Sequence, residues 1–171
     1  MVLHAPTRAE PVIVGYQDWR DLLFIHWRVP ATEIAPLVHP RLSVDERDGT
    51  GWVSMTPFTL RNGRLRGLPP LPDFHELNFR TYVTHPRHGP GIWFFSLDAA
   101  NRLAVAAARL SVRLPYFAAR MERGEGWYRS ADIAELNEDL SVAARMRPLG
   151  RPHSCQWSPG VSVAFEHFRP V

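Results

Sequence analysis

Lysine is absent from this chain, because all 20 of its basic residues are arginine. Without a side-chain amine no lysine Schiff base can form, which excludes pyridoxal enzymes and lysine aldolases, and the lysine of a phosphate-binding P-loop is missing too. The arginines are interspersed with 17 acidic residues, and the net charge of +3 gives little electrostatic steering at physiological salt. We therefore expect no nucleic-acid partner.

Cysteine is almost absent as well, since Cys155 is the single one. One cysteine excludes an internal disulfide and favours a reducing, cytoplasmic location. No apolar run approaches the roughly 18 residues of a membrane span, and the first residues lack the apolar core of a signal peptide. The 171 residues are the usual length of one domain, so we predict a single domain over 1–171.

Sequence motifs for cofactors, metals and nucleophiles are also missing. There is no G-x-S-x-G elbow and no G-x-G-x-x-G after a strand. The pairs His85/His88 and His153/Cys155 match no metal-binding spacing, and Pro86 favours a turn between the first two. We expect neither a cofactor nor a metal.

The elements that the sequence does predict are mainly short strands joined by turns, in keeping with 16 prolines and 11 glycines. Alternation and β-branched or aromatic residues predict strands at 24–29, 52–60, 77–83 and 91–97, with Pro57 marking an edge or a bulge. The 13 residues from 61 to 73 have no periodicity and are typical of a lid or binding loop.

Helices are fewer. The six alanines between 99 and 109 predict one, capped by Asp98, with an apolar stripe of Leu103, Ala106, Ala107 and Leu110. Weaker patterns predict two more helices, a short one at 32–38 capped by Thr32 and another that starts with a capping box at Asp132 and Glu135. They also predict a strand at 161–168. Pro148, Pro152 and Pro159 are expected to break any long element.

Two segments, ELNFRTYV (76–83) and WFFSLDA (93–99), resemble the YqjF-like family of uncharacterised bacterial proteins, and the resemblance spans about 16–130. That family is similar in fold to acetoacetate decarboxylase. The resemblance implies an α+β, mainly β fold: an antiparallel, cone-shaped barrel around a small-molecule pocket, with a few short helices. Residues 131–171 do not resemble the family, and we take them as divergent or truncated.

The resemblance also implies where a site would lie. Acetoacetate decarboxylases carry their Schiff-base lysine after a proline, and here Leu114-Pro115-Tyr116 would place Tyr116 at that position. A phenol, with a pKa near 10, can donate or accept a proton but forms no imine. Glu76 resembles the acidic residue that faces the pocket in those relatives.

Four polar side chains share one side of the predicted strand at 77–83 and the residue before it: Glu76, Asn78, Arg80 and Tyr82. Arg80 could hold a carboxylate in a fork, and a buried Glu76 could act as an acid or base. The alternative is that Glu76 and Arg80 form a pair without a role in function, either as a structural ion pair or on a solvent-exposed surface.

Three further residues are candidates with a plain structural alternative. His26 points away from Ile25 and Trp27 and is either a ligand-binding or a satisfied core histidine. Tyr116 either takes part in chemistry or closes a helix end over the core. Arg113 either contacts an acidic ligand or shields that helix end.

From these observations we predict a small-molecule pocket for an organic, anionic ligand. If the protein is an enzyme, it uses lysine-independent acid–base chemistry with Glu76 and Tyr116 as catalytic residues and Arg80, Asn78, Tyr82, His26 and Arg113 as binding residues. The alternatives are a non-catalytic binder on the same scaffold and a truncated, non-functional copy. The sequence leaves a homo-oligomer open.

Overall fold

The structure is a computed structural model, and it describes residues 13–111, 114–124, 127–131 and 149–166. Its main sheet has seven strands: β1 (Ile13–Val29), β2 (Ser43–Val44), β3 (Gly51–Leu65), β4 (Phe74–His85), β5 (Gly89–Ala99), β6 (Tyr116–Ala118) and β9 (Ser154–Glu166). A separate hairpin consists of β7 (Arg120–Gly124) and β8 (Trp127–Ala131). The described part is therefore an α+β fold dominated by strands, as predicted.

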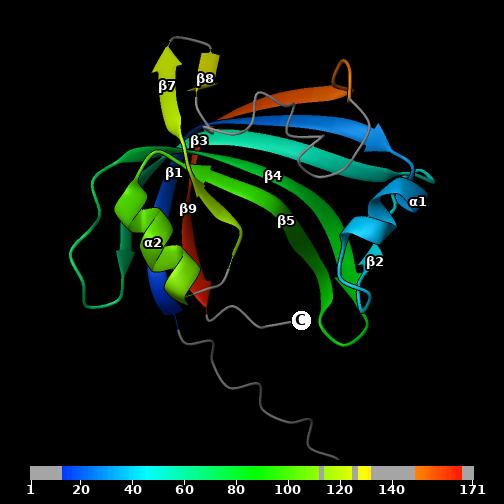
Figure 1. Cartoon of the computed structure of the whole chain (residues 1–171), viewed down its shortest axis with the longest axis horizontal. Helices are drawn as coiled ribbons and strands as arrows, with labels where there is room; N and C mark the ends of the chain where they lie inside the picture. The colour runs from blue at the N-terminus through cyan, green and yellow to red at the C-terminus, as the bar shows by residue number, and fades with distance from the viewer. Residues whose placement is uncertain (1–12, 112–113, 125–126, 132–148, 167–171) are drawn as a thin grey trace, which may run out of the picture.

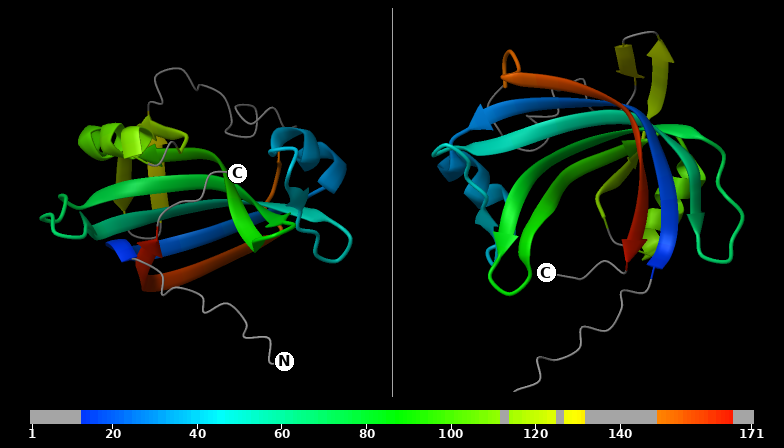
Figure 2. Two further views of the ribbon diagram at one scale, coloured as in Figure 1. Left: turned by 90° about the horizontal axis from the view of Figure 1, so that it is seen from below. Right: turned by 180° about the vertical axis from the view of Figure 1, so that it is seen from behind.

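The main sheet runs in the order β6-β5-β4-β3-β1-β9, with β2 paired to the end of β4. All pairs are antiparallel except β5 with β6. The sheet bends into an arch, and α1 (Ala31–Ile34) and α2 (Arg102–Ser111) lie near opposite ends of its strands (Figures 1 and 2). Among the described strands β6 and β9 do not pair, so the sheet is open there and the expected closed cone is not confirmed.

The predicted bulge at Pro57 is confirmed on the neighbouring strand. Pro57 pairs with Leu77 of β4, and the register of β1 against β3 shifts between Arg20 and Ile25, opposite this proline. Proline lacks the N–H that a regular ladder needs, so it is tolerated where the pairing of β1 is already irregular. Asp21, which lies in the irregular stretch, has a positive φ of 55°.

The connection predicted at 61–73 is shorter than expected. β3 continues to Leu65, and its last residues pair with β1, including Tyr16 with Arg64, so only 66–73 link β3 to β4. Pro159 does not break β9 either: Leu22 pairs with Ser158 and Arg20 with Gly160 across it. Within the described sheet β9 is an edge strand, where a missing N–H costs no ladder bond.

The helix predicted at 99–109 begins later than expected. Asp98 lies inside β5 and is fully buried, so it caps nothing; the Oδ1 atom of Asn101 instead accepts from the backbone N–H groups of Leu103 and Ala104 at 3.0 and 3.1 Å. The helical pattern at 32–38 forms α1 followed by a 3₁₀ turn at Ala35–Leu37, and α1 has no side-chain cap. The helix predicted from Asp132 lies outside the described residues.

The predicted apolar stripe of α2 does not face the core. Leu103 is 77% and Leu110 86% exposed, and Ala106 and Ala107 are exposed too. Ala104 and Val105 are buried instead. With four alanines in α2 both sides of the helix are apolar, so periodicity alone did not decide which side packs.

The core consists of two clusters on opposite faces of the sheet. One gathers Ile34 and Val38 over Val53, Phe79 and Val83. The other gathers Ala104 and Val105 of α2 over Phe58, Leu60, Phe74 and Ala99. Because Phe58, Glu76 and Ala99 lie directly opposite one another on adjacent strands, α2 covers the face that carries Glu76. No helix within the described ranges has the length and apolar character to cross a membrane.

Candidate functional site

One face of the central strands is polar although it is buried. Glu76, Asn78 and Arg80 alternate along β4 and are 3%, 1% and 5% exposed, and Ser54 and Thr56 lie opposite Arg80 and Asn78 on β3. The cross-strand pairs place the following residues on this side of the sheet, which we call the polar face: His26, Ser54, Thr56, Glu76, Asn78, Arg80 and Tyr82. Glutamate and arginine are rarely this buried unless they are paired, so the partners of Glu76 and Arg80 decide how this face is read.

Glu76 and Tyr116 are brought together at the α2 end of the polar face. The Tyr116 hydroxyl donates to Oε1 of Glu76 at 3.4 Å. Burial raises the pKa of Glu76 from its ordinary 4.5 to about 8, and the negative charge of Asp98 adds to the rise, while the Tyr116 hydrogen bond opposes it. Glu76 is therefore mostly protonated at pH 7, with a hydrogen on the carboxyl group to donate.

Tyr116 owes its position to β6 and α2. Its backbone pairs with Leu97 of β5, and its carbonyl oxygen accepts from Nε of Arg109 at 2.6 Å. Burial, and then the neighbouring Glu76, raise the pKa of Tyr116 above its ordinary value of 10. The phenol therefore stays a hydrogen-bond donor throughout the physiological pH range.

Arg80 does not join this pair. Its guanidinium carbon lies 5.9 Å from the ring centre of Phe24 on β1, and its buried Nε has no hydrogen-bond partner in the part of the chain that the structure describes. Of the three residues that we predicted to act together in one pocket, Glu76, Arg80 and Tyr116, only Glu76 and Tyr116 are in contact. The alternative of a Glu76–Arg80 ion pair is not seen either, within the described residues.

His26 and Tyr82 form a second pair near Arg80. The Nε2 atom of His26 lies 2.9 Å from the Tyr82 hydroxyl, and the two rings stack with 6.1 Å between their centres. Burial, and then the positive charge of Arg80, lower the pKa of His26 below its ordinary 6.5, so the ring is neutral at pH 7. Its Nδ1 atom is buried without a partner among the described residues.

Ser54 and Thr56 belong to the polar face although we did not predict them. Both are fully buried, and their hydroxyl oxygens lie 3.3 Å apart. The signal was present in the strand WVSMTPF, where these hydroxyls alternate with Val53 and Met55.

Asp98 is a second buried carboxyl group, but it lies on the opposite face, because it pairs with Leu77. Burial raises the pKa of Asp98 to about 6, while the Ser96 hydroxyl opposes the rise.

Arg113 and the histidine pair His85/His88 are the other residues that the sequence singled out. Arg113 lies outside the described residues. His85 and His88 stack at 4.5 Å in the β4–β5 turn, and the described ranges contain no group of three or more metal-ligating side chains.

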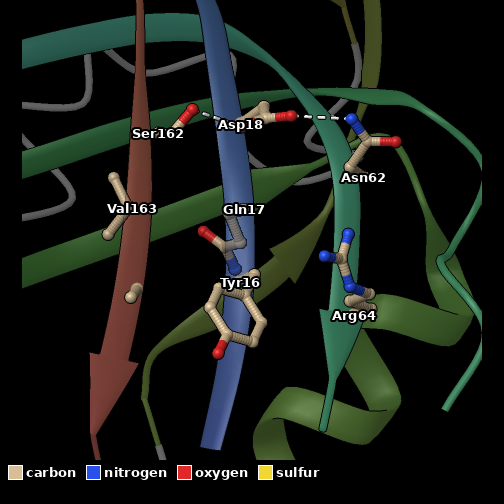
Figure 3. A pocket seen from close by; sticks show the side chains of 8 residues that line it. Tyr16, Gln17, Asp18, Asn62, Arg64, Ser162 and Val163 are labelled. Carbon is tan, nitrogen blue, oxygen red and sulfur yellow. Dashed lines mark hydrogen bonds between the residues drawn. The ribbon is translucent and has the colours of Figure 1, made fainter. Parts of the chain in front are cut away.

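A shallow hollow lies on another part of the sheet, across β9, β1 and β3 (Figure 3). On its β1 strand Asp18 accepts hydrogen bonds from Asn62 and Ser162, both at 2.6 Å. These bonds satisfy the carboxylate and lower the pKa of Asp18, so the hollow offers a ligand little that is unpaired.

The sequence shows which family the chain belongs to. It belongs to the DUF2071 family, described as uncharacterized conserved proteins, whose model matches residues 16–169. The match extends well beyond residue 130, where we expected the resemblance to end.

One relative is the uncharacterized protein YqjF of Bacillus subtilis, which is 42% identical over 145 residues. That alignment covers 82% of this chain and 60% of YqjF, so the chain spans less than two thirds of this relative.

Solved structures of acetoacetate decarboxylase share the fold. One is 13% identical with a TM-score of 0.53, and the match covers 92% of this chain and 78% of that one. The enzyme from Legionella pneumophila is 14% identical with a TM-score of 0.51 and covers 70% of this chain and 45% of its own. At such identities the likeness shows the fold alone.

Proposed function

We propose that the polar face binds a small organic carboxylate and that Glu76 exchanges a proton with it without forming an imine. The observation that carries this proposal is the set of buried polar atoms without partners among the described residues on one face: His26 Nδ1, Glu76 Oε2, Asn78 Oδ1 and Arg80 Nε. Leaving a buried polar group unpaired costs about 1–3 kcal/mol, more for a charged group, so a cluster of them is expected to meet a ligand.

The chemistry of these atoms favours an anionic ligand. Arg80 is a buried cation whose Nε donor is unused, and a guanidinium binds carboxylates through charge-assisted hydrogen bonds. His26 Nδ1 adds a neutral hydrogen-bonding atom beside it, and Asn78 Oδ1 adds an acceptor for a donor group elsewhere on the ligand, not for the carboxylate itself. These three residues supply binding and orientation.

Glu76 supports acid–base chemistry. With a pKa of about 8 it is near the operating pH of most enzymes, so it can donate a proton and recover one. Tyr116 stays protonated beside it and can stabilise a developing negative charge on oxygen. Because the chain has no lysine, the imine route of lysine-dependent decarboxylases is closed to its side chains.

The alternative function is a non-catalytic binding protein on the same scaffold. The missing amine favours it, since the carboxylate-binding part of the site can persist without catalysis. We keep the cytoplasmic location as part of either proposal, on the strength of the free Cys155.

The test measures binding and proton exchange together. The purified protein is titrated with 4-oxopentanoate by calorimetry, and exchange of the hydrogens next to the ketone is followed by proton NMR in D₂O. We expect binding to weaken at least tenfold in Arg80→Met, and exchange to be lost in Glu76→Gln while binding persists.

Asp98→Asn is the matched control, because it also changes a buried carboxyl group to an amide, but on the opposite face. It should leave both binding and exchange in place, with the pH dependence of exchange moved to lower pH, because the Asp98 charge helps to raise the pKa of Glu76. Binding without exchange in the wild-type protein would select the binding protein over the enzyme. No binding of 4-oxopentanoate or other carboxylates of any length would refute both.

A further inference from the structure

The side of α2 that faces away from the sheet is apolar, exposed and flanked by arginines. We infer that this side of α2, together with the neighbouring loop at 66–73, docks on the surface of an anionic lipid membrane. The leucines of both elements enter the headgroup layer, and their arginines bind the negatively charged groups of the lipids. Docking of this kind needs no membrane-spanning helix, and it does not depend on the ligand of the polar face.

The first observation is the position of two leucines on α2. Leu103 and Leu110 are seven residues apart, which is two turns of an α-helix, so they stand in line on one side. Ala104 and Val105 face the sheet, whereas both leucines are more than three quarters exposed. A single exposed leucine is ordinary on a protein surface, but two in line form an apolar stripe that the fold leaves open to an outside partner.

The second observation is the charge beside this stripe. Arg102 and Arg109 are also two turns apart, on one flank of the leucines, and α2 contains no acidic residue. Neither arginine forms an ion pair within the described residues, since Arg109 hydrogen-bonds a backbone carbonyl and lies 5.3 Å from the ring centre of Phe117. An apolar crest with a basic flank is typical of helices that lie in a membrane interface.

A second element lies at the same end of the molecule. The loop at 66–73 links β3 to β4, and Figures 1 and 2 show it at the end of the strands where α2 lies. It leads directly into Phe74, which packs with Ala104 and Val105 on the buried side of α2. The loop and the helix therefore border the same part of the sheet.

The loop also exposes leucines. Leu68 is 58% exposed, and Leu65 and Leu71 beside it are exposed as well. The backbone N–H groups of Leu68 and Leu71 donate to the carbonyl oxygens of Leu65 and Gly63, at 3.0 and 2.7 Å. These bonds fix the backbone of the loop at both leucines, so their outward placement follows from the structure of the loop.

The loop and the end of β3 are basic. Arg64 and Arg66 are exposed, and the one acidic residue between 61 and 73 is Asp73. Asp73 is already paired with Nε of Arg61 at 3.5 Å. This end of the molecule thus presents leucines beside an excess of positive charge, as α2 does, which suits the negative surface of a cytoplasmic membrane leaflet.

The residue types favour a membrane over a protein partner. In an antiparallel pair of α2 helices from two copies of the chain, Arg102 of one copy would lie beside Arg109 of the other, and like charges at an interface are unfavourable. Leucine is under-represented among the residues that dominate protein–protein binding. A bilayer surface accepts leucines and arginines side by side.

The experiment measures cosedimentation of the full chain with lipid vesicles at low ionic strength. The vesicles contain phosphatidylcholine alone or with about one third phosphatidylserine, and we expect at least tenfold tighter binding to the anionic ones. Binding should weaken at least tenfold at about 1 M salt, where the screening length falls to about 3 Å.

Substitutions of the leucines identify the surface. The double variant Leu103→Ser/Leu110→Ser should weaken binding to the anionic vesicles at least tenfold, and Leu68→Ser should weaken it several-fold. These side chains are exposed, so the variants should unfold at the temperature of the wild-type protein. Ile92→Ser is the matched control, because Ile92 is an exposed apolar residue toward the opposite end of β5 from α2, and it should bind like the wild-type protein.

Substitutions of the arginines test the charge. Arg66→Gln/Arg102→Gln should weaken binding to the anionic vesicles and reduce its dependence on salt. Arg87→Gln removes an exposed arginine in the β4–β5 turn, away from this surface, and should change neither.

Three results would overturn the inference. One is that the wild-type protein binds neither kind of vesicle. Another is that the control variants Ile92→Ser and Arg87→Gln weaken binding as much as the variants of α2 and the loop. The third is a dimer, seen by sedimentation velocity without lipid, that Leu103→Ser/Leu110→Ser dissociates, because a second copy would then cover this surface. None of these results concerns Glu76 or Arg80, so the proposed function is tested separately.

Discussion

The buried carboxyl group of Glu76 should make the stability of the protein depend on pH in a way that one substitution removes. Its pKa is raised to about 8 in the folded protein, against 4.5 in the unfolded chain. A raised carboxyl pKa means that the folded state holds the proton more tightly, so its contribution to stability is complete below pH 4.5 and is lost as the pH rises through 8. Glu76→Gln has no proton to lose and should lack this term.

The magnitude follows from the two pKa values. At about 1.4 kcal/mol per pKa unit, the wild-type protein loses about 2 kcal/mol by pH 6 and about 4 kcal/mol by pH 8, relative to acid pH. The window from pH 6 to 8 is the cleanest, because the other raised carboxyl group, Asp98, has a pKa of about 6 and contributes mostly below it. A change of about 2 kcal/mol is large beside a total stability of about 5–15 kcal/mol.

The assay is urea denaturation followed by tryptophan fluorescence at pH 6, 7 and 8, for the wild-type protein, Glu76→Gln and Asp98→Asn. The free energy of unfolding of the wild-type protein should fall by about 2 kcal/mol more than that of Glu76→Gln over this range. That of Asp98→Asn should also fall more than that of Glu76→Gln, but by less than in the wild-type protein, because the charge of Asp98 helps to raise the pKa of Glu76. Parallel pH profiles for the wild-type protein and Glu76→Gln would show that Glu76 is not a buried, protonated carboxyl group.

Further predictions concern the pair with Tyr116 and the placement of α2. Tyr116→Phe removes the hydrogen bond that favours ionised Glu76, so the pKa of Glu76 should rise further. In the same urea titrations the free energy of unfolding should then continue to fall up to a higher pH than in the wild-type protein. An unchanged pH profile would argue against the contact. Asn101→Ala removes the helix cap and should lower the free energy of unfolding by about 1 kcal/mol, whereas a neutral result would mean that the helix starts elsewhere. Val105→Ala should cost about 2 kcal/mol in thermal or urea unfolding and Leu110→Ala less than about 0.5 kcal/mol, and the reverse order would mean that the opposite side of α2 packs on the sheet.

The sequence predicted the strands better than the helix faces. Alternation placed Glu76, Asn78 and Arg80 on one side of β4, and the structure has them there, because a period of two leaves no other choice once the strand forms. The bulge opposite Pro57 followed in the same way from the missing N–H. The two-residue period of a strand and the missing N–H of proline are local properties, so both can be recognised in the sequence without knowledge of the tertiary structure.

What the sequence did not predict depends on tertiary contacts. Asp98 reads as a helix cap, but β5 extends through it because β6 pairs alongside. The direction in which Arg80 extends is set by Phe24, which is 56 positions away in the chain, and alternation carries no information about it. The burial of both sides of β4 likewise depends on α2 and on the strands beside it.

The affinity of 4-oxopentanoate for Arg80→Met and for Asp98→Asn, compared with its affinity for the wild-type protein, shows whether a carboxylate binds at the polar face. A charge-assisted hydrogen bond is worth about 1.5–3 kcal/mol, so Arg80→Met should bind at least tenfold more weakly, while Asp98→Asn should bind like the wild-type protein. Equal affinities in all three proteins would mean that the carboxylate does not bind at the polar face.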